Sequence, residues 1–228
     1  AARRDRSIPR YALACSWSGV ALAGLGRDSE AFAVLEEAVR YAADSPGVWN
    51  LYSSAMFRLG VPQKAIGAAR MSVAAAERKM PVQAPVRQLL ELNVHRYALA
   101  QALLNVDGDA EDQEAATILR QITTSLDSNS FEALRKTLGT REEFQIVAAP
   151  TTESGMYLSI FNRSHMRLAW LYETGGQSEK ARAEYQAVVS RRSDEASALA
   201  GLARLAADAQ ERDRYLIQSL DANPFAAD

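Results

Sequence analysis

The chain has 228 residues with 26 basic and 28 acidic side chains, so its net charge is −2 at neutral pH. This balance argues against a protein that neutralises the phosphates of DNA or RNA over a wide surface, although it leaves room for a local basic patch. Hydrophobic residues make up 48% and charged residues 24%, as in an ordinary folded globular chain. The single cysteine, Cys15, excludes an intrachain disulfide, and no apolar run reaches the ~18 residues of a membrane span.

Residues 1–11 are expected to form an N-terminal arm that carries four arginines, Arg3, Arg4, Arg6 and Arg10. We interpret the arm as a frayed, solvated end, and the alternative is a basic arm that touches an acidic partner. The chain begins with Ala1 and contains no signal-peptide apolar region. We therefore expect that a leader has been removed or that the chain is a piece of a longer protein. A soluble protein, either cytoplasmic or exported, fits both origins.

Further along the chain, alanines that follow Glu or Lys mark a repeated helix, namely Ala31, Ala65, Ala115 and Ala181. The first two are 34 residues apart, which is the period of a two-helix repeat. In the stretch "PGVWNLYSSAMFRLGVPQKAI", Gly60 should end one helix and Pro62 should start the next. Trp49 should pack along the first helix, and the small Ala65 should let the two helices cross closely.

The third repeat departs from this period. Pro81 and Pro85 break the preceding helix within residues 77–96, and a long helix is expected from Val86 to Val106. The sequence "NVDGDAED" should then form the turn before a poorer copy of the second helix around Ala115.

Residues 127–155 form an irregular insertion. "NSFEALRKTLG" predicts a short helix that starts at Asn129 or Ser130 and stops at Gly139. "EEFQIVAAPTTESG" has an extended apolar run followed by a polar loop. "MYLSIF" could pair with "FQIVA" as a strand or could begin the helix that continues through "NRSHMRLAWLYETG", and we favour the helix.

These residues resemble the tetratricopeptide repeat family, whose motif is matched over about residues 12–78 and 160–224. The matching positions are Gly19, Leu22, Gly26, Ala31 and Leu35, then Trp49, Met56, Gly60 and Ala65, and then Leu168, Tyr172, Gly176, Ala181 and Tyr185. The resemblance implies an all-α, right-handed helical-repeat solenoid with an irregular insertion. We expect repeats over residues 12–126, with the third irregular, and C-terminal repeats over residues 156–228.

The resemblance also implies a concave groove, lined by the first helix of each repeat, in which a protein or peptide binds. Its positions in the second repeat bring Asn50, Ser54 and Phe57, with Arg58 adjacent, and in the late repeat they bring Arg163, Met166, Arg167, Trp170 and Glu173. Arg163 and Arg167 are one helical turn apart and can share a carboxylate, and a Trp flanked by Arg is typical of a binding hot spot. The alternative is that residues 127–155 cover this late helix.

Some members of the family hold chaperone tails with a carboxylate clamp of basic and Asn side chains. Asn50, Arg163 and Arg167 resemble part of that clamp. The first repeat departs from it, with Leu13, Ser16 and Val20 at the groove positions. An acidic partner, or one with a free C-terminal carboxylate, is therefore the expected ligand type.

The residues predict neither catalysis nor a metal or cofactor. His165 takes the position of Trp49 in a later repeat and should be buried and hydrogen-bonded, and Cys15 should be a small packing residue. "DGDAEDQE" lacks the ligand spacing of a calcium loop. The leading hypothesis is a non-catalytic scaffold for protein or peptide binding. The alternative is a regulatory or substrate-recruiting region of a larger enzyme or membrane-associated assembly.

Overall fold

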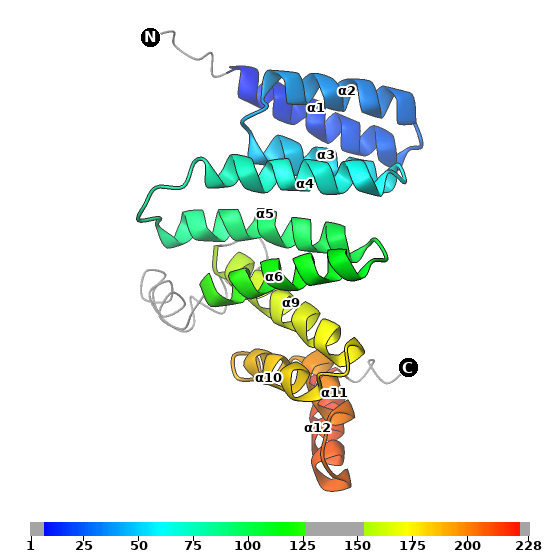
Figure 1. The fold of residues 1–228 in the computed structure, drawn as a ribbon, viewed down its shortest axis with the longest axis vertical. Helices are drawn as coiled ribbons and strands as arrows, with labels where there is room; N and C mark the ends of the chain where they lie inside the picture. Colours follow the sequence, from blue (N-terminus) through cyan, green and yellow to red (C-terminus); the bar gives the residue numbers. More distant parts are fainter. Residues whose placement is uncertain (1–6, 126–152, 224–228) are drawn as a thin grey trace. The chain divides into compact units, whose positions relative to one another are not determined.

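The computed structural model describes residues 7–125 and 153–223, and every regular element in these residues is an α-helix (Figure 1). The fold is therefore an all-α helical-repeat solenoid, as the sequence predicts. The chain divides into two units, residues 1–118 and 119–228, which are described separately. The helices are α1 (Ser7–Gly24), α2 (Asp28–Tyr41), α3 (Pro46–Arg58), α4 (Pro62–Glu77), α5 (Val86–Leu104), α6 (Asp109–Ser125), α9 (Glu153–Thr174), α10 (Ser178–Val189), α11 (Ala196–Arg204) and α12 (Ala209–Ala222).

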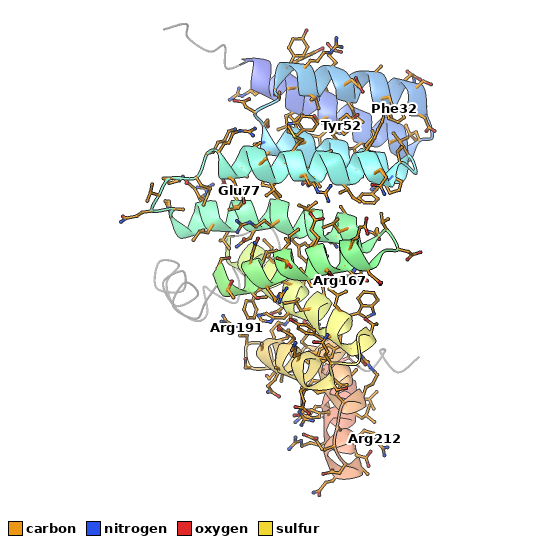
Figure 2. The ribbon with its side chains drawn as sticks, in the orientation of Figure 1. Phe32, Tyr52, Glu77, Arg167, Arg191 and Arg212 are labelled. Carbon is orange, nitrogen blue, oxygen red and sulfur yellow. The ribbon has the colours of Figure 1, made fainter. Side chains whose placement is uncertain are left out.

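In the first unit, α1 packs against α2 and α3 packs against α4, and successive pairs meet through α1 with α3 and α4 with α5. The core between the pairs contains Leu35, Tyr52 and Met56, all buried, with Phe32 and Trp49 packed at its edge (Figure 2 labels Phe32 and Tyr52). Trp49 also donates a hydrogen bond from its Nε1 to the carbonyl oxygen of Ala43 at 2.8 Å. Trp49 thus fixes the start of α3 while it contributes to packing.

The turn between the two helices of a repeat has the same geometry at three places. Gly26, Gly60 and Gly176 have φ angles of 71°, 69° and 69°. After α3, the amide of Val61 donates to the Met56 carbonyl at 2.9 Å and the amide of Gly60 donates to the Phe57 carbonyl at 3.0 Å. This pair of bonds is the Schellman motif, and it recurs after α1 and α9. The φ angles and the hydrogen bonds confirm the predicted turns. Glycine suits these positions because it adopts positive φ without a Cβ clash.

The repeated alanines lie on α2, α4, α6 and α10. Ala31, Ala65, Ala115 and Ala181 are all fully buried. Between α3 and α4 the Ser53 hydroxyl donates a hydrogen bond to the backbone carbonyl oxygen of Ala65 at 2.8 Å. A side chain of α3 therefore contacts the backbone of α4 directly. A larger side chain at Ala65 would separate the two helices.

The irregular third repeat forms largely as predicted. Helix α4 ends at Glu77, before Pro81 and Pro85, and α5 is a long helix that ends at Leu104, two residues before the predicted end. The predicted turn over "NVDGDAED" is too long, because α6 already begins at Asp109. The carboxylates of its first turn, at Asp109, Glu111 and Asp112, suit the positive end of the helix dipole.

One further expectation differs from the structure and another is confirmed. Helix α1 begins at Ser7, so residues 7–11 belong to the first helix rather than to an arm, and Pro9 is tolerated because it lies in the first turn. Helix α9 starts at Glu153, so "MYLSIF" is helical and the favoured alternative is confirmed. The expected short helix and extended run within residues 127–152 lie outside the described residues.

In the second unit, α9 packs against α10 and α11 packs against α12. Two side chains cap the N-terminus of α12. Asp208 Oδ1 accepts a hydrogen bond from the Glu211 amide at 2.8 Å, and Glu211 Oε2 accepts one from the Ala207 amide at 3.1 Å. The Arg182 guanidinium on α10 bonds to the Glu211 carboxylate and to the Leu205 carbonyl oxygen. These bonds join α10 to α12, so the last helix pair is held by polar contacts as well as by packing.

Candidate functional site

A hollow of about 450 Å³ lies on the first unit between α3 and α5. All four groove residues predicted from the second repeat, Asn50, Ser54, Phe57 and Arg58, line it. The third repeat and the buried side of α3 contribute the rest of the lining, which consists of Ser53, Ala98, Gln101, Ala102 and Asn105. The predicted residues are therefore neighbours in space, and their partners across the hollow come from α5.

The lining combines amides with one cation. Asn50, Gln101 and Asn105 offer amide donors and acceptors, of which one is in use because Asn105 Nδ2 donates to the Gln101 carbonyl at 2.8 Å. Arg58 is exposed, and its Nη1 atom lies 3.9 Å from the position that a Cβ on Gly24 would take. The guanidinium therefore reaches from α3 to the end of α1, where it has no carboxylate partner among the described residues. Such a lining offers hydrogen-bond donors and acceptors together with one cation.

The predicted residues of the late repeat lie on α9 of the second unit. Arg163, Arg167 and Trp170 are exposed, with 45% of the Trp170 surface accessible (Figure 2 labels Arg167). The alternative, in which residues 127–155 cover this helix, depends on a segment of which residues 127–152 lie outside the described residues. Among the described residues no carboxylate pairs with Arg163 or Arg167. Met166 is different, because it is half-buried and packs against the core of this unit.

Glu173, the last predicted residue of α9, is committed to contacts within the protein. Its carboxylate accepts from Arg204 Nε at 2.8 Å and Nη2 at 3.0 Å, and from the Tyr185 hydroxyl at 2.8 Å. The Arg204 guanidinium holds the pKa of the Glu173 carboxyl below its ordinary value. Burial, together with the hydrogen bond to Glu173, raises the pKa of Tyr185 to about 12. Glu173 thus joins α9 to α11 and is not a free acid on the surface.

The histidines and the cysteine occupy packing positions. His165 is 9% exposed, and its Nδ1 lies 2.5 Å from Glu184 Oε2, so the prediction of a buried, hydrogen-bonded histidine is confirmed. Cys15 is half-buried and packs against Ala12, Ala38 and Val48, as expected of a small packing residue.

The prediction from sequence missed part of the lining of the hollow. Gln101 and Asn105 come from the third repeat, whose first helix is longer than the family's and whose motif is poor, so the groove positions could not be assigned there by alignment. Trp17, on α1, was also missed, although 59% of its surface is exposed. The signal available for Trp17 was its spacing of one helical turn from Leu13.

The described residues, 7–125 and 153–223, offer neither a metal-binding cluster nor a membrane-spanning helix. No cluster of three His, Cys, Asp or Glu side chains has the arrangement of a metal site there. In the same residues, the helices are either too short or too polar to cross a bilayer.

The comparisons with known proteins point to one repeat family. The family model for the tetratricopeptide repeat matches residues 163–195. No curated protein matches the sequence significantly. Among solved structures, a protein of Podosopora anserina described as a kinesin light chain with nearly identical TPR-like repeats is 19% identical, with a TM-score of 0.61 over 94% of this chain and 95% of that one.

Two other structures are similar over most of their length. MamA is 13% identical, with a TM-score of 0.56 over 90% of this chain and 94% of its own. YrrB, described as a TPR protein with an unusual peptide-binding site, is 11% identical, with a TM-score of 0.55 over 91% of this chain and 84% of its own. At these identities the likeness is one of fold.

Proposed function

We propose that this chain, of which residues 163–195 match the tetratricopeptide repeat model, is a non-catalytic scaffold that binds an extended segment of a partner protein in the hollow between α3 and α5. The observation that carries the proposal is the gathering of the four predicted residues of one repeat in the lining of a single hollow. Repeat arrays present long surfaces of this kind, and their function is argued from such a surface rather than from the fold.

The chemistry of the hollow suits the backbone and one acidic group of a peptide. The side-chain amides of Asn50, Gln101 and Asn105 can donate to and accept from peptide groups, which an extended segment leaves unpaired. Arg58 can form a charge-assisted hydrogen bond with a carboxylate, a contact that contributes about 1.5–3 kcal/mol. The partner is accordingly a segment that carries an acidic side chain or a free C-terminal carboxylate. The peptide-binding site described for YrrB is consistent with this use of the fold.

The exposed stripe on α9 is a second candidate contact for an acidic partner. Arg163 and Arg167 are one turn apart, and Trp170 follows within the next turn. The guanidinium groups can share a carboxylate while the indole covers the neighbouring apolar surface, which is the composition of a binding hot spot.

A capture experiment followed by titration tests the proposal. The full chain, immobilised, captures partners, and each captured segment is titrated calorimetrically against the wild type and an Asn50→Ala, Arg58→Glu variant. The variant should weaken binding by at least about a hundredfold, because the contact of Arg58 with the carboxylate and the amide contact of Asn50 are lost together. Arg40 is an exposed residue of α2 that does not line the hollow, so Arg40→Glu is the matched charge control and should bind normally.

The α9 stripe is tested in the same titration with Arg167→Glu and Trp170→Ala combined. Loss of a hot-spot Trp alone costs at least about 2 kcal/mol, so the combined change should raise the dissociation constant by more than about thirtyfold. Wild-type affinity in both the Asn50→Ala, Arg58→Glu variant and the Arg167→Glu, Trp170→Ala variant would show that the partner uses another surface. Far-UV circular dichroism checks that each variant is folded.

A further inference from the structure

Helix α1 carries an apolar stripe that faces the same side as the end of the hollow. Leu13 and Trp17 keep 41% and 59% of their surfaces exposed, and Val20 is half-buried. These residues and Gly24 are spaced four, three and four positions apart. At about 100° per residue, this spacing places all four within a narrow sector of one helix face. The stripe runs along α1 from Leu13 to Gly24.

The stripe ends at the free cation of the hollow. Gly24 is the stripe residue whose Cβ position lies 3.9 Å from Nη1 of Arg58, so the guanidinium stands at the C-terminal end of the stripe. Arg58 also lines the hollow between α3 and α5, and the apolar stripe is therefore continuous with it. An exposed Trp on the stripe and an exposed Arg at its end, which has no carboxylate partner among the described residues, together have the composition of an anchor site.

The distance along α1 defines the spacing of a ligand. Trp17 precedes Gly24 by seven positions, which corresponds to about 10 Å along a helix axis. An extended peptide advances about 3.3 Å per residue, so it covers that distance in three or four residues. A helical ligand would need about seven residues for the same distance, but its backbone groups would already be paired and would leave the amides of Asn50, Gln101 and Asn105 without a role.

We propose that Trp17 and Arg58 are the two anchor points for an extended acidic peptide in which an apolar side chain and a carboxylate lie three or four residues apart. This inference rests on the proposed function and adds the sequence pattern of the partner. The apolar side chain packs on the indole of Trp17 between Leu13 and Val20. The carboxylate accepts hydrogen bonds from the Arg58 guanidinium, and the peptide backbone beyond the carboxylate continues toward the amides of the hollow.

Fluorescence anisotropy with a designed peptide series tests the pattern. The probes are labelled peptides with blocked ends, in which one Leu and one Asp are separated by two, three, four or seven positions in a Gly/Ser background, in both orders. Binding to the full chain should be tightest at three or four positions. Trp17→Ala should weaken the best peptide by about thirtyfold and Arg58→Gln by about tenfold or more, whereas the peptide that lacks Asp should no longer distinguish Arg58→Gln from the wild type.

Two matched controls separate these anchors from general surface effects. Leu25→Ala removes a side chain that is 73% exposed and lies outside the stripe, and Arg40→Gln removes a cation of α2. Both should bind the best peptide as the wild type does, and circular dichroism should be unchanged in all four variants. Sedimentation of the wild type and Trp17→Ala is measured in parallel, since an exposed apolar stripe can also join two copies of a chain.

Several outcomes overturn the inference. They are equal binding at every spacing, an optimum at seven positions, wild-type affinity in Trp17→Ala, and self-association that Trp17→Ala abolishes. With any of these results the proposed function still stands if captured segments lose affinity for the Asn50→Ala, Arg58→Glu variant. If the captured segments also ignore that variant, the proposed function fails together with the inference.

Discussion

His95 is a half-buried histidine whose protonation opposes folding. Its Nδ1 lies 2.9 Å from the Ser72 hydroxyl, which itself lies 2.8 Å from the Pro46 carbonyl oxygen. Because the carbonyl can only accept, the hydroxyl proton points to Pro46 and Nδ1–H donates to Ser72. Burial lowers the pKa of His95 from 6.5 to about 4. The neutral ring therefore links α5 to α4 and, through Ser72, to the start of α3.

This shift predicts a specific acid sensitivity. In the unfolded chain His95 takes up a proton near pH 6.5, whereas in the folded chain it resists protonation until about pH 4. The unfolded state thus binds more protons between these values, and the free energy of unfolding should fall by about 1.4 kcal/mol per pH unit, or about 3 kcal/mol in all. Above pH 6.5 the contribution is fully present, and it is lost as the pH falls toward 4.

Urea denaturation of the wild type and His95→Gln across this window measures the effect. The variant has no titrating ring, so its stability should fall less steeply with acid, although it starts lower at neutral pH because the bond to Ser72 is disturbed. Parallel curves for the two proteins would show that His95 does not carry the acid sensitivity. Circular dichroism at neutral pH establishes that the variant is folded.

At the scale of single residues, the sequence predicts packing better than it predicts the binding surface. Ala65 and His165 are buried as expected, because a position within a repeat dictates its neighbours. Glu173 was expected at the groove, and its pairing with Arg204 depends on a contact between helices that no local pattern reveals. The exposure of Trp17 likewise depends on how the neighbouring helices pack around it, which no local sequence pattern reveals.

The spacing between paired helices is set by small residues at the contact. A Cβ on Gly19 of α1 would lie 2.7 Å from Leu35 Cδ2 of α2 and closer still to its Cγ. Leu35 is fully buried, so its side chain cannot turn out into solvent to relieve the clash. Gly19→Ala should therefore destabilise the protein by about 1–3 kcal/mol through overpacking.

Gly67→Ala is the matched substitution in the same unit. Gly67 is exposed within α4, and a Cβ there meets nothing within 4 Å. Alanine favours the helix by about 0.5–1 kcal/mol over glycine, so this change should stabilise the protein. Thermal and urea denaturation compare the two variants. A Gly19→Ala protein as stable as Gly67→Ala would contradict the close α1–α2 approach.

At the scale of helices, the start and stop signals carried most of the prediction. Gly60 and Pro62 mark both sides of one turn, and Pro85 precedes the long α5, because these residues restrict the backbone itself. The start of α6 was predicted too late, since a run of carboxylates reads equally well as a solvated turn and as a favourable first helical turn. The choice between helix and strand for "MYLSIF" could be weighed only by the longer periodicity that follows it.

At the scale of the whole molecule, the contacts are mainly those between neighbouring helices. In the first unit α1 meets α2 and α3, and α4 meets α5, while in the second α10 meets α9 and α11. Stability in such an array is a sum of the stability of each repeat and of the contacts between adjacent repeats. A change at one end should therefore remain local unless the whole chain unfolds as one cooperative unit.

Hydrogen exchange in Gly19→Ala and Gly201→Ala distinguishes these possibilities. A Cβ on Gly201 would lie 2.5 Å from Cζ of Tyr185, whose hydroxyl is already fixed by Glu173 and Arg204, so this substitution overpacks the second unit as Gly19→Ala overpacks the first. Gly19→Ala should accelerate amide exchange in α1 to α3 and leave α10 to α12 close to the wild type. Gly201→Ala should show the reverse. Equal acceleration of both units in either variant would mean that the chain unfolds as a single cooperative body, because local overpacking would then lower the stability of every helix at once.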